Sequence, residues 1–210
     1  MDSSLSYAKK RQITVTDSIF RVVRAPAGTL TESHEVQAVN GTPTKGEQVR
    51  GPTSVSGVFT GSLNAVSLSQ SACMRYALQP IDPGHPNQPY VIQFATLPNT
   101  QGRPECLLKE EGAGRVFVDP ATFEVTRMEL RAPNHSINPY EGGIWRIAID
   151  YAPVSLVGKT FWMPATVAST ATVASTPIPH RPDPTIVYSF SAKYSDYHKL
   201  EVTSHIVPAQ

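Results

Sequence analysis

The sequence lacks most of the bulk features that point to a partner. Charged side chains make up 17% of its 210 residues, below the ~25% that is usual in soluble domains. The net charge is only +1, which gives no electrostatic reason to expect a nucleic acid. No apolar run approaches the ~20 residues that a membrane-spanning helix needs. We therefore predict neither a nucleic-acid partner nor a transmembrane segment.

Sequence motifs that carry chemistry are also missing. The chain has no Walker loop, no GxGxxG, no GxSxG, no HExxH and no CxxC motif. We accordingly predict no catalytic residue, no cofactor and no metal site. An enzyme stays open as an alternative. It would need titratable groups gathered in one pocket, for instance Arg127, Glu129, Asp196 and His198.

Cysteine is scarce, with only Cys73 and Cys106. Two cysteines allow one disulfide, which would add ~3–4 kcal/mol in the chain-entropy model and would require an oxidising compartment. The alternative is a pair of buried, small apolar side chains. Metal binding is not favoured, because no Cys or His lies two to four positions from either one.

The chain is instead rich in strand and turn signals. Residues 115–118 alternate in polarity, Asp119-Pro120 forms a turn signal, and residues 124–130 alternate again, which predicts a β-hairpin. Residues 144–151 and 160–164 continue the pattern around a turn at Gly158-Lys159. The central part of the chain is therefore predicted to be an antiparallel meander.

Further strands are predicted on both sides of this meander. The segment 30–39 ends at Asn40-Gly41, a strong turn signal because both residues tolerate positive φ. Segments 72–78 and 90–95 are expected to pair. The remaining expected strands are 14–23, 166–177, 185–192 and 198–207. The sum is a mainly β fold of about ten strands.

One helix is expected, over residues 54–69. Val55, Phe59, Leu63 and Val66 recur at helical spacing and would form a single apolar face. Gly57 and Gly61 weaken this expectation by ~1 kcal/mol each. The simplest interpretation is a helix that packs on the sheet.

Two tryptophans, Trp145 and Trp162, fall in predicted strands. They are consistent with core packing or a cross-strand aromatic pair. They are also consistent with the walls of an apolar ligand groove on the concave face of a curved sheet. In the second case the ligand-binding residues would be Val55, Phe59, Leu63, Trp145 and Trp162.

The order of elements and several short motifs resemble a known group of proteins. The motifs are GRVFVDPATFEVTRMEL, then IAIDYAPVSLVGKTFWMP, then the closing YSDYHKLEV. They resemble those of uncharacterised exported β-rich proteins found in acidobacteria. The overall plan is similar to the lipoprotein-carrier fold of the outer-membrane localisation proteins. The matching positions are Gly114, Val116, Val118, Asp119, Val125, Arg127, Asp150, Tyr151, Pro153, Val154, Gly158, Lys159, Phe161, Pro164, Tyr197, Lys199 and Leu200.

The resemblance implies a half-barrel: a curved antiparallel sheet with a helix on its concave face. It also implies export to the periplasm or outer envelope. We expect a flexible segment over residues 1–12 and a single half-barrel domain over 13–208. The start of the chain lacks the basic and apolar regions of a signal peptide, so we expect a leader that has been removed. Lipoprotein carriers have more helix, and their cavity residues have no counterpart here. The resemblance therefore carries the fold and not the carrier activity.

Three functions from different classes remain open. The first, which we prefer, is a non-catalytic exported protein that binds a hydrophobic molecule such as a lipid or acyl chain. The second is a structural or protein-interaction module of the cell envelope, as a homodimer or with another envelope protein. The third is a small-molecule enzyme on the same fold.

Overall fold

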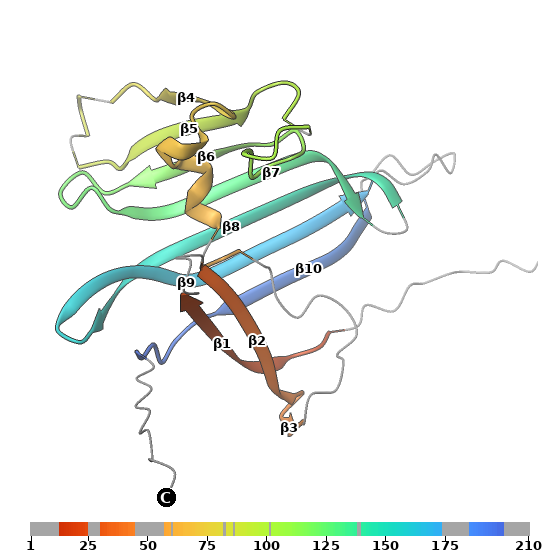
Figure 1. Ribbon diagram of the computed structural model, residues 1–210. Coiled ribbons are helices and arrows are strands. Elements are labelled where there is room, and N and C mark those ends of the chain that lie inside the picture. The colour runs from red at the N-terminus through yellow and green to blue at the C-terminus, as the bar shows by residue number, and fades with distance from the viewer. Residues whose placement is uncertain are drawn as a thin grey trace, which may run out of the picture. The chain divides into compact units, whose positions relative to one another are not determined.

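The computed structural model describes residues 13–24, 30–44, 57–59, 61–81, 83–85, 87–100, 102–137, 140–173 and 185–199 (Figure 1). These residues form ten strands and two short 3-10 helices. The fold is mainly β and antiparallel, as the alternating sequence pattern predicts. The flexible segment predicted for residues 1–12 lies outside the described residues.

The chain divides into two compact units, Met1–Ser54 and Val55–Gln210. The sequence-based expectation placed residues 13–208 in one half-barrel, whereas the strands form two separate sheets. Among the described residues, the first three strands form a sheet of their own in the order β1 (Thr16–Arg24), β2 (Leu30–Val39) and β3 (Thr42–Pro43). Strands that are consecutive in the chain commonly lie side by side.

In the first unit, β1 and β2 pair antiparallel from Thr16↔Val39 to Arg24↔Leu30, with a bulge at Asp17/Ser18. The predicted turn at Asn40-Gly41 is present, with φ of 50° and 78°. It joins β2 to β3. The Oδ1 atom of Asn40 also accepts a hydrogen bond of 2.9 Å from the Val15 amide. Asn40 therefore forms the turn and also holds Val15, the residue before β1, in place.

The second unit is built on a seven-stranded antiparallel sheet that is not closed into a barrel. Its strands follow one another in space in chain order, from β4 at one edge to β10 at the other (Figure 1). The predicted meander is thus confirmed, including the pairing of 72–78 with 90–95. The strands are β4 (Met74–Leu78), β5 (Tyr90–Thr96), β6 (Ala113–Val118), β7 (Val125–Ile137), β8 (Tyr140–Leu156), β9 (Lys159–Val173) and β10 (Thr185–Lys193).

One face of this sheet carries the core. A row of directly opposed side chains crosses four strands, in the order Val116 (β6), Met128 (β7), Ile149 (β8) and Val167 (β9). Each is exposed by 3% or less. Side chains two residues apart share a face of a strand, so the alternating pattern of the sequence becomes an apolar face here. A register shift at Asp150/Tyr151 keeps Pro164, opposite Tyr151, on the buried side together with Val167.

The helix predicted over residues 54–69 is not formed. The described part of that segment is a turn at 57–59 followed by two 3-10 helices, η1 (Ser62–Val66) and η2 (Leu68–Gln70). Gly57 has φ of 77°, which a right-handed helix does not allow. Ser67 is extended, with ψ of 144°, and its hydroxyl accepts a bond from the Ser69 amide. Local serine bonding of this kind competes with helical bonding.

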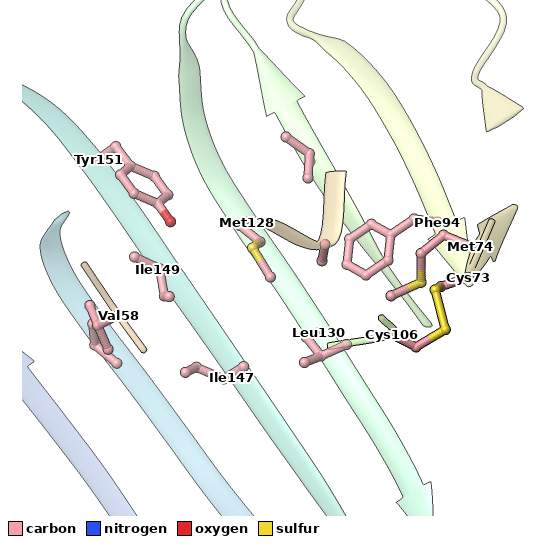
Figure 2. Packing of buried hydrophobic residues seen from close by; sticks show 13 residues of the cluster. Val58, Cys73, Met74, Phe94, Cys106, Met128, Leu130, Ile147, Ile149 and Tyr151 are labelled. Carbon is pink, nitrogen blue, oxygen red and sulfur yellow. A yellow bond between two sulfur atoms is a disulfide. The ribbon is translucent and has the colours of Figure 1, made fainter. Parts of the chain in front are cut away.

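The segment still covers the core face of the sheet. Val58 and Ala65 belong to the same buried cluster as Met128 and Ile149, and Figure 2 shows Val58 above the sheet beside Ile149. The hydroxyl of Tyr76 on β4 donates to the Ala65 carbonyl at 2.9 Å. Of the predicted apolar face, Phe59 and Val66 pack against this cluster, whereas Leu63 is 37% exposed and Val55 lies outside the described residues. The buried members, Val58 and Ala65, were not part of the predicted face.

Cys73 and Cys106 form a disulfide at one end of this core, with Cα atoms 5.5 Å apart (Figure 2). Both residues are buried, at 0% and 1% exposure. Gln70 reinforces the link, because its amide donates to the Glu105 carbonyl and accepts from the Leu107 amide. The disulfide thus holds the loop before β6 against the start of β4.

Candidate functional site

Of the five residues predicted to line a ligand cavity, the four that the structure describes do not gather in one place. Phe59, Trp145 and Trp162 are partly buried and pack against the core cluster. Leu63 is 37% exposed, and Val55 lies outside the described residues. Trp145 is opposite Ala171, whereas Trp162 is opposite Pro153. Their backbone positions are therefore eight steps apart along β8, roughly 26 Å along a strand.

Trp145 has a structural environment. Its indole N–H donates to the Ser169 hydroxyl at 2.8 Å, and its ring stacks on His135 with centroids 5.1 Å apart. The His135 Nδ1 atom in turn lies 2.8 Å from Glu110 Oε1. The polar edge of a buried tryptophan needs such a partner, so the contacts explain the residue without a ligand.

Phe59 belongs to an aromatic group at the end of the chain. It makes edge contacts with Tyr194 and Tyr197, at 5.0 and 6.3 Å between centroids. The Tyr197 hydroxyl donates to the Pro164 carbonyl, and burial raises the pKa of Tyr197. Residues 194–199 are irregular, so the strand predicted from residue 198 does not begin there. The rest of that prediction, residues 200–207, lies outside the described residues.

The residues named for an enzyme do not form a catalytic pair. His198 Nδ1 lies 3.0 Å from the Asp196 backbone carbonyl, and the Asp196 carboxylate accepts from Ser195 instead. Asp196 has φ of 57°, so the two side chains do not share a strand face. Arg127 and Glu129 pair with each other on the sheet. Within the described residues, no three His, Cys, Asp or Glu side chains are placed to hold a metal.

A groove lies elsewhere, at the tip of the β8–β9 hairpin. It has a volume of about 340 Å³, and Leu156, Val157, Lys159, Phe161 and Lys199 line it. Val157 is 72% exposed and Phe161 is 44% exposed. The lining therefore combines apolar side chains open to solvent with two ammonium groups.

The hairpin tip extends beyond its neighbouring strand (Figure 1). Arg127 of β7 is opposite Asp150, at the end of the β7–β8 pairing. Among the described strands, residues 151–156 of β8 pair with β9 and not with β7. The base of this projection is covered, since Tyr151 is 7% exposed and the Tyr197 hydroxyl donates to the Pro164 carbonyl, whereas Val157 and Phe161 nearer the tip are exposed.

The turn at the tip is conformationally strained. Val157 has φ of 51° and Gly158 has φ of 72°, which is the positive-φ pair of a type I′ hairpin. Asn-Gly is the favoured sequence there, and a β-branched residue with positive φ is a genuine outlier. The sequence-based turn at Gly158-Lys159 lay one residue too late, so the strained valine was missed. The Val157-Gly158 pair, a valine directly before the turn glycine, was the sequence signal that could have revealed this strained turn.

The outer face of the sheet, opposite the core, carries a network of charged groups. Arg115 donates to Glu129 Oε2 at 2.6 Å, and Arg127 Nε donates to Glu129 Oε1 at 2.9 Å. Arg127 also donates to Asp150 at 2.5 Å, and Thr166 donates to the other Asp150 oxygen. Burial alone would raise the pKa of Glu129. Its bonds to Arg127 and Arg115 outweigh that effect, and the pKa lies below the usual value.

No protein-family model, no curated protein and no solved structure matches this chain. The similarity to exported acidobacterial proteins and to lipoprotein carriers thus stays a prediction. None of the helices in the described residues is long and apolar enough to span a membrane.

Proposed function

We propose that this protein is a non-catalytic, exported protein that binds lipid, and that the β8–β9 hairpin tip is the binding element. The preferred expectation from the sequence was a hydrophobic ligand on the concave face of the sheet. The core face is covered by residues 57–70 and their partners. The hairpin tip supplies the exposed apolar surface instead.

The observation that carries the proposal is Val157. Its left-handed conformation costs about 1–2 kcal/mol for a residue with a Cβ. At 72% exposure, the side chain recovers little of this cost by packing within the protein. Backbone strain that packing within the protein does not offset is typical of functional sites, so it suggests that Val157 contacts another molecule. Insertion into acyl chains would stabilise the exposed valine and phenylalanine by burying them.

The charges at the tip favour an anionic lipid surface. Lys159 and Lys199 line the same groove as Leu156 and Phe161. Apolar side chains beside ammonium groups fit the boundary of a bilayer, where acyl chains meet anionic headgroups. The proposed ligand is therefore the surface of a membrane that contains anionic phospholipid. The disulfide supports export, because such bonds persist in oxidising compartments.

Replacing Val157 with asparagine tests this function. Val157→Asn should raise the free energy of unfolding by about 1 kcal/mol, because asparagine tolerates the left-handed conformation. It should also weaken binding to vesicles of mixed phosphatidylcholine and phosphatidylglycerol by about tenfold or more, since burying a valine contributes ~1.5–3 kcal/mol. Chemical denaturation and vesicle co-sedimentation measure the two effects.

The matched control is Ile81→Asn, a change at another apolar residue of the same unit that is 54% exposed. It should leave vesicle binding unchanged. Loss of binding in both variants, or wild-type protein that ignores every vesicle, would refute the lipid function. Equal binding to dispersed fatty acid and to vesicles would indicate that the protein binds single lipid molecules and not a membrane surface.

A second function, protein interaction, rests on β10. This strand is the last in the sheet, and Lys193 is the only charged residue in Thr185–Lys193. Open edges with few charges pair readily with another strand. A stable dimer in sedimentation velocity, combined with absent vesicle binding, would favour this function over lipid binding.

A further inference from the structure

Two arginines on the outer face of the sheet stand directly opposite each other. Arg131 of β7 is paired with Arg146 of β8, and both are exposed. No acidic side chain in the described part of the chain forms an ion pair with either guanidinium. Like charges directly opposite on neighbouring strands are destabilising, so this pair needs an explanation.

The carboxylates of this face are already engaged. Glu129 accepts from both Arg115 and Arg127, and Asp150 accepts from Arg127 and Thr166. Neither carboxylate is therefore available to neutralise Arg131 or Arg146. Glu111 accepts a bond of 3.4 Å from the Asn134 amide and forms no ion pair with either arginine in the described part of the chain. A cationic site is left open to solvent.

The row of the two arginines continues with hydroxyl groups. Arg146 is opposite Thr170 of β9, and Thr170 is opposite Ser189 of β10. Neighbouring strands lie about 4.8 Å apart, so the row from Arg131 to Ser189 is roughly 14 Å long. It offers two cations and then two hydroxyls. The neighbouring positions on β8 and β9 are the small Ala148 and Ala168 on one side of the row, and Ile144 and Thr172 on the other.

We propose that this row binds an acidic polysaccharide that lies across β7, β8, β9 and β10. Carboxylate or sulfate groups of the polymer contact Arg131 and Arg146, and its sugar hydroxyls contact Thr170 and Ser189. A single exposed ion pair contributes only about 0.2–1 kcal/mol, so a polymer with repeated charges fits this open face better than a small anion.

Two observations favour a polysaccharide over a nucleic acid. The row contains no aromatic ring on which bases would stack. The disulfide also indicates an oxidising compartment, where acidic polysaccharides are exposed and nucleic acids are scarce. This site is separate from the hairpin tip, so either proposal can fail while the other stands.

The test uses the full chain, sodium alginate as the acidic polymer, dextran as its neutral counterpart, and single-stranded DNA as a competing polyanion. We expect alginate binding that weakens with added salt. In Arg131→Gln/Arg146→Gln the affinity should fall roughly 2- to 30-fold, the loss of two exposed ion pairs. The thermal midpoint should not fall, because a repulsion is removed.

The control is Arg21→Gln/Arg24→Gln, which removes the same charge from β1 in the first unit. It should leave alginate binding unchanged. An equal loss in both double variants would show unspecific attraction and overturn the proposal. Absent alginate binding, binding to dextran as tight as to alginate, or tighter binding to DNA would overturn it as well.

Discussion

At the residue scale, Gly114 shows how one position shapes the sheet. It lies on β6 between Phe94 of β5 and Leu130 of β7. A Cβ at this position would collide with the Glu129 carbonyl and with the Phe94 ring. The missing side chain lets the Phe94 ring lie over the backbone of β6, and Phe94 is only 3% exposed as a result.

Gly114→Ala is therefore expected to be strongly destabilising. Either the β6–β7 pairing shifts or Phe94 leaves its place in the core, and overpacking of this kind costs about 1–3 kcal/mol or more. Urea denaturation followed by tryptophan fluorescence measures the loss. Gly102→Ala is the control, because nothing lies within 4 Å of its added carbon. A Gly114→Ala protein as stable as that control would contradict the packing described here.

At the element scale, the loops are held by few but specific bonds. The disulfide spans 33 positions and closes a loop that contains β4 and β5. Arg103 Nη1 donates to the Ala72 carbonyl at 2.7 Å, next to the same junction. Gln70, in the second 3-10 helix, bonds to Glu105 and Leu107 on either side of Cys106. The 3-10 segment that packs on the core is therefore tied to the disulfide.

Removing the disulfide should lower the free energy of unfolding by about 3–4 kcal/mol, since the unfolded chain gains the entropy of an open loop of this length. For a chain of this size that equals a fall of roughly 10 °C in the midpoint. Calorimetry with and without a reducing agent measures it. Cys73→Ala/Cys106→Ala should match the reduced protein and should not respond to the reducing agent. An unchanged midpoint in both would refute the expected contribution.

At the scale of the whole molecule, several carboxyls are held in their charged form by neighbours. The backbone amides of Thr122 and Ala121 lower the pKa of Asp119 at the β6–β7 turn. The bonds to Arg127 and Arg115 lower the pKa of Glu129. A carboxyl whose pKa is lower in the folded state than in the unfolded state stabilises the fold above its unfolded pKa.

The contribution of these two carboxyls to stability should therefore be constant above about pH 5 and should be lost as the pH drops through their lowered folded-state pKa values. The unfolded reference values are 3.8 for Asp119 and 4.5 for Glu129. Urea midpoints measured from pH 7 down to pH 2 test this. Asp119→Asn/Glu129→Gln should have a shallower acid slope than the wild-type protein. A slope identical in both would show that other groups set the acid stability.

The sequence by itself determined the elements that local rules govern. Alternation over 115–118 and 124–130 reflects a sheet with one buried face, and period two is a property of the strand itself. Asn40-Gly41 specified a turn because few residues adopt positive φ. The meander followed from short connections between consecutive strands. These signals depend on neighbours in the chain, so they could be interpreted without a structure.

Tertiary structure alone decided what those elements do together. The apolar spacing of 54–69 indicated a helix, but Gly57 and Ser67 allow the core to be covered by turns and 3-10 helices instead. The opposition of Arg131 and Arg146 depends on the β7–β8 register, and the exposure of Val157 depends on how far β8 extends past β7. Register and burial arise from contacts between distant residues, and for that reason both candidate sites became visible only in the folded chain.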